Sequence, residues 1–139
     1  VMTARDVFAE LPFGNKTVVL AMSGADVMAA LENSVSKIED ASGRFMQVSK
    51  NMAVVYDRNA ASGSRVVSAM VNGAAIDAGA TYTVATNDFL ARGGDGYATF
   101  ATAGVVLSAD ASQLMASHVV DFIRANGISN EGEGRITFQ

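Results

Sequence analysis

The sequence predicts a single α+β domain in which a mixed sheet packs with helices. The chain has 139 residues, half of them hydrophobic, which fits one domain that buries about two-thirds of the surface exposed by its unfolded chain. Segments with the period of a helix and segments with the alternation of a strand follow one another in mixed order. No repeat, linker or low-complexity stretch separates them, so one domain over residues 1–139 is expected.

Composition excludes several classes of function. The formal net charge is −4 and no cluster of Lys or Arg is present, which argues against a module that binds nucleic acid through phosphates. No apolar run approaches the roughly 20 residues of a membrane span. Cysteine is absent and His118 is the only histidine, so neither a thiolate site nor a two-metal centre is expected within this chain. As a lone histidine, His118 is predicted to lie on the surface or at a rim.

The first half of the chain alternates strong helix and strand patterns. Capping residues and apolar spacing define the helices, and β-branched runs define the strands. The expected elements are a helix that opens at Thr3 and is ended by Pro12, a strand over Thr17–Met22, a helix capped by Ser23 with Ile38 on its apolar face and broken at Ser42 and Gly43, and strands over Arg44–Ser49 and Met52–Arg58.

The second half is richer in strands and closes with a helix. Asn72 and Gly73 are a strong hairpin signal. Two short segments, 97–102 and 105–107, fit a strand or a turn equally. The remaining expected elements are strands over Arg65–Val71 and Tyr82–Ala85, a helix over Asp110–Ala125 and a final strand over Arg135–Phe138.

The segment Thr86–Tyr97 is the strongest candidate for a ligand-binding loop. Three glycines within four residues let another group approach the main chain closely, and Asp95 between them offers a carboxylate. Phe89 supplies a flat apolar face, and an aromatic plane near a carboxylate suits a nucleoside. The alternative is a tight turn with Phe89 in the core and Asp95 capping local amides. Phe13 lies on a connector and has two similar interpretations: its ring covers the core, or it is a platform for a ligand.

Seven motifs carry a family resemblance. In chain order they are Leu11-Pro12-Phe13-Gly14-Asn15, Ser42-Gly43, Phe45-Met46-Gln47-Val48-Ser49, Val55-Tyr56-Asp57, Asn87-Asp88-Phe89, Gly93-Gly94-Asp95-Gly96-Tyr97 and Gly134-Arg135-Ile136. As an ordered set covering nearly the whole chain, they resemble the C-terminal domain of the 5'-nucleotidase family. The resemblance implies that family's fold and a substrate-binding role.

Site residues follow from the resemblance position by position. Phe13 and Phe89 match the two rings between which the base stacks, and Asn15 matches the side chain that hydrogen-bonds the base. Gly43 matches a close backbone approach beside the base. Asp95 matches the acceptor for the ribose hydroxyls. Stacking of one base face is worth about 1 to 3 kcal/mol, which agrees with the chemistry expected of these residue types.

The resemblance also implies what lies outside this sequence. The family's N-terminal domain is a calcineurin-like metallophosphoesterase that holds two divalent metal ions, such as Zn or Mn. We expect that domain, and a glycine-rich first segment bearing a substrate-contacting arginine, to precede Val1. The chain itself is then expected to bind no cofactor and to be inactive alone. Members of this family are usually exported or surface-bound, so the resemblance implies a periplasmic, extracellular or cell-surface protein.

Three functions remain open from the sequence. The first is the nucleotide-binding domain of a metal-dependent enzyme that hydrolyses nucleoside monophosphates to nucleoside and phosphate. A second is the same domain in a 2',3'-cyclic nucleotide phosphodiesterase/3'-nucleotidase or a UDP-sugar hydrolase. A third, of another class, is a non-catalytic binding or interaction module that retains only a vestigial pocket.

Overall fold

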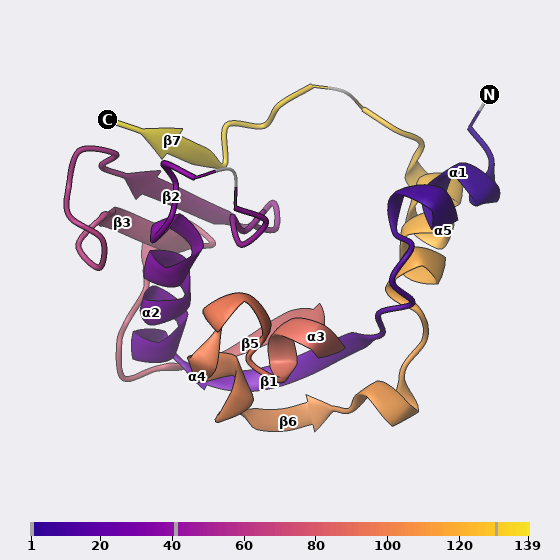
Figure 1. Ribbon diagram of the computed structural model, residues 1–139, viewed down its shortest axis with the longest axis horizontal. Coiled ribbons are helices and arrows are strands. Elements are labelled where there is room, and N and C mark those ends of the chain that lie inside the picture. Colours follow the sequence, from indigo (N-terminus) through magenta and orange to yellow (C-terminus); the bar gives the residue numbers. More distant parts are fainter. Residues whose placement is uncertain (1, 41, 130) are drawn as a thin grey trace.

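The computed structural model describes residues 2–40, 42–129 and 131–139 of the chain (Figure 1). Helices and strands alternate without a simple repeat. In chain order they are α1 (Ala4–Glu10), β1 (Thr17–Ser23), α2 (Gly24–Val35), β2 (Met52–Tyr56), β3 (Val66–Val71), β4 (Ala74–Ala75), β5 (Thr81–Asn87), α3 (Asp88–Ala91), α4 (Ala98–Ala101), β6 (Gly104–Leu107), α5 (Met115–Asn126) and β7 (Ile136–Phe138), with 3-10 turns at Gly94–Gly96 and Ala109–Ala111.

The strands form two separate sheets. One has the order β5-β1-β6 and is antiparallel throughout, with β1 in the centre. The other has the order β4-β3-β2-β7 and is mixed, because β7 runs parallel to β2 while the other pairs are antiparallel. The prediction of an α+β domain with mixed strand pairing is therefore confirmed.

Helix α2 joins the two sheets and carries much of the core between them (Figure 1). Its apolar face buries Val27, Leu31 and Val35, which recur at the i, i+4, i+8 spacing of one helix side. Alternate residues of β1 are also buried, so this strand turns one face to the same core. Ser23 accepts a hydrogen bond from the Asp26 amide and caps the helix, as its sequence position predicts.

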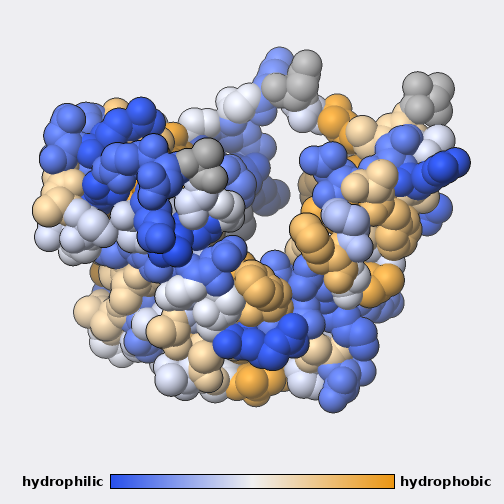
Figure 2. Space-filling model, in the orientation of Figure 1, coloured by the Kyte–Doolittle hydropathy of each residue, from blue (hydrophilic) through white to orange (hydrophobic). Residues whose placement is uncertain are grey.

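A second, smaller cluster joins α1 to α5. Val7 of α1 packs with Ala116 and Val120 of α5. In Figure 1 this helix pair stands to one side of the sheets. Figure 2 shows an opening between the pair and the rest of the molecule, bordered on the helix side by apolar side chains. The connector from α1 to β1, which carries Phe13, therefore links two parts of the fold.

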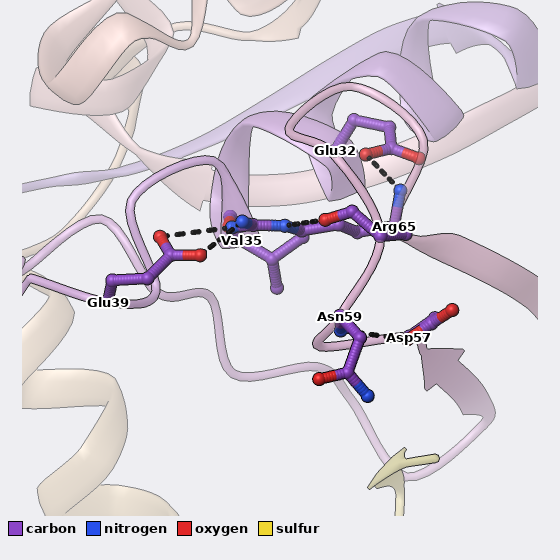
Figure 3. A network of polar contacts seen from close by, with 7 residues as sticks. Glu32, Val35, Glu39, Asp57, Asn59 and Arg65 are labelled. Atoms are coloured by element: carbon purple, nitrogen blue, oxygen red, sulfur yellow. Dashed lines mark hydrogen bonds and ion pairs between the residues drawn. The ribbon is translucent and has the colours of Figure 1, made fainter.

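A buried arginine sets the end of α2. The prediction carried this helix to the Ser42-Gly43 break with Ile38 on its face, but the helix ends at Val35. The Arg65 guanidinium donates to the Val35 carbonyl, and the Ser36 amide bonds back to Asn33 (Figure 3). These partners close the last turn early and leave Ile38 in the following turn.

Two other predicted elements differ from the structure for similar reasons. The strand predicted over Arg44–Ser49 is irregular chain, because its backbone groups bond to the Ser34 hydroxyl and the Arg135 guanidinium in place of a neighbouring strand. The helix predicted from Asp110 begins only at Met115. Ala109–Ala111 form a separate 3-10 turn, and an isolated antiparallel bridge between Lys16 and Leu114 keeps the chain out of the helix until Met115.

Candidate functional site

The connector Phe13–Asn15 presents an exposed aromatic ring beside a fixed amide. Phe13 is 87% exposed, which rules out the alternative in which it covers the core. Gly14 adopts a φ of 64°, so the chain turns sharply between the ring and Asn15. The Asn15 carbonyl accepts a hydrogen bond of 2.8 Å from the Met115 amide. The connector is thereby anchored to the start of α5.

Asp88 ties this connector to the segment after β5. One of its carboxylate oxygens accepts a 3.0 Å bond from Asn15 Nδ2 and a 3.1 Å bond from the Lys16 amide. The other accepts from Arg92 at 3.0 Å. The bond from the Asn15 side chain is the largest influence that lowers the pKa of Asp88 to about 2. Asp88 is therefore ionised at neutral pH and acts only as an acceptor.

Phe89 follows Asp88 on the one-turn helix α3 and lies against the glycine-rich turn. The ring is 44% exposed, so the alternative that places it in the core is wrong. A Cβ on Gly94 would lie 2.5 Å from two carbons of this ring. The absence of a side chain at Gly94 is thus what allows the ring to rest on the backbone. The predicted loop Thr86–Tyr97 accordingly contains the end of β5, α3 and a 3-10 turn.

Asp95 stands at the tip of this turn in a left-handed conformation. Its φ is 53°, between Gly93 at 87° and Gly96 at 82°, and non-glycine residues adopt such angles only when neighbours hold them. The Asn33 side chain, on α2, donates to the Asp95 carbonyl at 3.1 Å. Among the described residues the Asp95 carboxylate has no hydrogen-bond partner, so it does not cap local amides.

Gly43 lies one residue before an arginine that reaches the same turn. Arg44 Nη1 donates to the Ser36 hydroxyl at 3.0 Å and contacts Asn33 Oδ1 at 3.4 Å. The buried Tyr97 hydroxyl donates to the Arg44 carbonyl at 2.5 Å. A Cβ on Gly43 would meet nothing within 4 Å, so its main chain is open on that side.

The five residues expected at the site thus lie on one run of contacts, in which neighbours along the chain link one contact to the next. From Phe13 and Asn15 it passes through Asp88 to Phe89, across Gly94 to Asp95, and through Asn33 and Arg44 to Gly43. No aromatic pair in the described part of the chain includes Phe13 or Phe89, so both rings are free of aromatic partners. The pocket beside Phe13 and Asn15 is lined by residues of the connector, α1 and α5.

Sequence reasoning missed the residues that connect this run. Asp88 stands inside a motif to which the sequence assigns no role, and it pairs with Arg92, whose side chain is 68% exposed. No sequence pattern indicates a role for Asn33. Asp88 could have been noticed as an acidic residue directly after a strand, next to Asn87, which caps α3 through the Leu90 amide. His118 is exposed on α5, as predicted.

The site chemistry does not extend to a metal centre in the described part of the chain. Within the residues that the structure describes, no group of three or more His, Cys, Asp or Glu side chains could hold a metal ion. None of the helices described combines the length and apolar character that crossing a membrane requires. The groups described at this site supply exposed aromatic faces, hydrogen-bond donors and acceptors, and charge.

Comparison with known proteins decides the family. A family model described as the 5'-nucleotidase C-terminal domain matches residues 1–102. This chain belongs to that family. The 5'-nucleotidase from the venom of Naja atra is 33% identical over 147 residues, covering 99% of this chain and 27% of the venom protein. The trifunctional nucleotide phosphoesterase YfkN of Bacillus subtilis is 36% identical over 107 residues, covering 73% of this chain and 7% of that protein.

Solved structures of 5'-nucleotidases share the fold of this family member. A 5'-nucleotidase precursor from Thermus thermophilus matches with a TM-score of 0.90 and 35% identity, over 99% of this chain and 28% of that one. A 5'-nucleotidase from Staphylococcus aureus matches with a TM-score of 0.79 and 27% identity, over 100% of this chain and 30% of that one. The chain spans only about a third or less of the length of most of these relatives. The family resemblance inferred from its motifs is confirmed.

Proposed function

We propose that this chain is the substrate-binding domain of a metal-dependent 5'-nucleotidase that hydrolyses nucleoside monophosphates to nucleoside and phosphate. In this proposal the base stacks between Phe13 and Phe89, Asn15 hydrogen-bonds the base, the Gly43 backbone lies beside it, and Asp95 accepts from the ribose hydroxyls. The observation that carries the proposal is the single run of contacts joining these five residues while both rings stay exposed.

The chemistry of each group supports its assigned role. Two exposed rings on separate segments offer faces for a flat base, and each stacked face contributes about 1 to 3 kcal/mol. A carboxylate without protein partners is suited to accept from two vicinal hydroxyls, because bonds to an ionised acceptor are stronger than neutral ones. The residues of this chain bind and orient the nucleoside in this proposal, and none is assigned a chemical step.

The remaining parts of the enzyme are assigned to a domain outside this sequence. The described residues do not fit a metal centre. We therefore assign the two divalent metal ions that the family resemblance implies to an N-terminal metallophosphoesterase domain, and we expect residues 1–139 alone to be inactive. The similarity to snake venom enzymes supports an exported protein, whether periplasmic, extracellular or at the cell surface.

Two other functions compete with this proposal. A 2',3'-cyclic nucleotide phosphodiesterase/3'-nucleotidase or a UDP-sugar hydrolase would need the same binding domain. The similarity to a trifunctional phosphoesterase and to UshA of Yersinia enterocolitica is the reason to consider these activities. A binding module that takes no nucleotide would leave the Phe13 and Phe89 ring signals unmoved by adenosine in NMR titration of the full-length protein.

Truncation of the two rings in the full-length enzyme tests the proposal. The base does not change during the reaction, so substrate and transition state should lose the same contact in Phe13→Ala and Phe89→Ala. Steady-state kinetics with adenosine 5'-monophosphate should show KM raised about 5- to 150-fold, with kcat changed much less. Phe122→Ala, which removes an exposed ring on α5, is the matched control and should leave KM unchanged.

A further substitution separates the two ends of the ligand. Asp95→Asn removes the charge with a residue that tolerates a φ of 53°. It should raise KM for the ribose substrate more than for a 2',3'-dideoxyribose analogue, which offers the carboxylate nothing. A collapse of kcat for both sugars with KM unmoved would show that Asp95 takes part in chemistry or domain closure and would contradict its assignment to the ribose.

A further inference from the structure

We propose that Asp88 is a positioning residue that fixes the orientation of the Asn15 amide, so that the site selects bases carrying an exocyclic amino group. This inference rests on the proposed function and concerns the same site. It assigns Asp88 no contact with the ligand. Its effect is exerted entirely through the side chain of Asn15.

The first step of the argument is that only one end of the Asn15 amide can face Asp88. An ionised carboxylate has no proton to donate, and the pKa of Asp88 is lowered to about 2 chiefly by its bond from Asn15. Nδ2 of Asn15 lies 3.0 Å from the carboxylate oxygen. The reverse orientation would set Oδ1 of the amide against a negative charge, so the carboxylate excludes it.

The second step is that Asp88 itself cannot turn away. The same oxygen that receives Asn15 accepts the Lys16 amide at 3.1 Å, and the opposite oxygen is paired with Arg92 at 3.0 Å. The Asp88 side chain is only 19% exposed. The backbone of Asn15 is fixed as well, through its carbonyl and the Met115 amide. Rotation of the amide is the remaining freedom, and Asp88 removes it.

The third step counts the hydrogen-bonding groups that Asn15 has left. A side-chain amide has two N–H donors and a carbonyl with two lone pairs. One N–H is used by Asp88, and Oδ1 has no partner among the described residues. The free edge therefore presents a fixed acceptor and a single N–H. A base edge with an amino group donates to Oδ1, whereas a carbonyl at the same place would bring two acceptors together.

The experiment uses the full-length protein and three substrates that differ at one position of the purine. These are the 5'-monophosphates of adenosine, purine riboside and inosine, which carry an amino group, hydrogen and an oxo group respectively. The expected order of kcat/KM in the wild type is amino, then hydrogen, then oxo, with the first exceeding the last by about tenfold or more. A wild type without preference for the amino substrate would overturn the inference.

Two variants then test Asp88. Asp88→Ala removes the oxygen that accepts from both the Asn15 amide and the Lys16 backbone, so both orientations of the Asn15 amide become available and the amino-to-oxo ratio should fall to within about threefold of unity. Asn15→Ala removes the selecting group without touching the other partners of Asp88 and should lower the ratio similarly. Asp121→Asn, which breaks another Asp–Arg pair, on α5, is the control and should leave the ratio unchanged.

The outcomes are distinguishable. A structural role of Asp88 alone would lower kcat/KM for all three substrates alike, and an unchanged ratio in folded Asp88→Ala would overturn the inference while the proposed function stands. A full-length protein that hydrolyses none of the three would overturn the proposed function and this inference with it. Thermal unfolding measured beside the kinetics identifies a variant that fails to fold, in which case Asn15→Ala decides.

Discussion

Arg65 and Asp88 each centre a polar network that ties together segments far apart in the sequence, yet they differ in what they leave open. Arg65 is only 6% exposed, and its guanidinium donates to the carbonyls of Val35 and Ala60 and to the carboxylate of Glu39 (Figure 3). Glu32 in turn accepts the amides of Arg65 and Val66. Apart from the carboxylate of Glu39, which is 60% exposed, the groups of this network bond within the protein interior.

The Asp88 network contains the same kinds of group, but some of its hydrogen-bonding groups have no partner among the described residues. Among the described residues the amide oxygen of Asn15 has no hydrogen-bond partner, and the rings of Phe13 and Phe89 are exposed. A network with all its hydrogen bonds satisfied internally holds the fold together, whereas one with spare acceptors and exposed rings can also hold a ligand. The comparison therefore predicts that substitutions at Arg65 act on stability and that those near Asp88 act on binding.

The largest expected effect is at Arg65. Arg65→Met keeps much of the apolar stem but leaves the Val35 and Ala60 carbonyls without their donor, so the free energy of unfolding should fall by about 3 kcal/mol. Urea unfolding of residues 1–139 measures the change. Glu39→Gln is the control, because the Glu39 side chain is 60% exposed and its loss should cost much less than the loss of Arg65. An Arg65→Met protein as stable as the wild type would contradict a closed structural network.

An acid titration gives a smaller effect that separates Asp88 from its surroundings. The pKa of Asp88 lies near 2 in the folded chain against an ordinary value of 3.8, so its ionised form is favoured by folding. Its contribution to stability is complete above about pH 4 and is lost as the pH falls toward 2. The stability difference between wild type and Asp88→Asn should therefore shrink by about 1 to 2 kcal/mol over that range.

Urea unfolding of both proteins at several pH values measures this difference, and other carboxylates cancel in the comparison. The pKa of Glu39 is also lowered, chiefly by its hydrogen bond from Arg65, so a Glu39→Gln series run in parallel should show a loss in the same direction. A difference between wild type and Asp88→Asn that stayed constant from pH 5 to pH 2 would show that Asp88 is not ionised preferentially in the folded state.

The two networks also show which parts of the fold were predictable. The helix capped by Ser23 and the strand β1 follow from local spacing, and both begin where the sequence predicts. The end of α2 depends on Arg65, which lies 30 residues beyond the carbonyl it binds. No local pattern announces such a partner, and the same holds for the irregular segment 44–49.

In the candidate site, too, local sequence predicts some features and distant partners determine others. Phe13, Asn15, Gly43, Phe89 and Asp95 could be named from motifs, and the structure places them on one run of contacts. The residues that join them were not predictable, because the bond from Asn15 to Asp88 spans 73 positions and that from Asn33 to Asp95 spans 62. Sequence motifs indicate which groups are candidates to meet a ligand, and the fold is needed to show which groups hold them.

The smallest effect is expected at Gly94, and it tests whether the position of the Phe89 ring matters. A Cβ at this glycine would come within 2.5 Å of the ring. Because the neighbour is a half-exposed side chain and not backbone, the ring can swing toward solvent, and Gly94→Ala should change the unfolding free energy by less than about 1 kcal/mol. The displaced ring would no longer stand ready for the base. KM of the full-length enzyme should then rise about three- to tenfold with kcat nearly unchanged. This effect is smaller than that of removing the ring, because part of the stacking is recovered when the ligand binds.

Gly132→Ala, where a Cβ would meet nothing within 4 Å, is the matched control and should leave KM as it was. Unchanged KM in Gly94→Ala, together with raised KM in Phe89→Ala, would mean that the ring binds the base without needing its resting place on the turn.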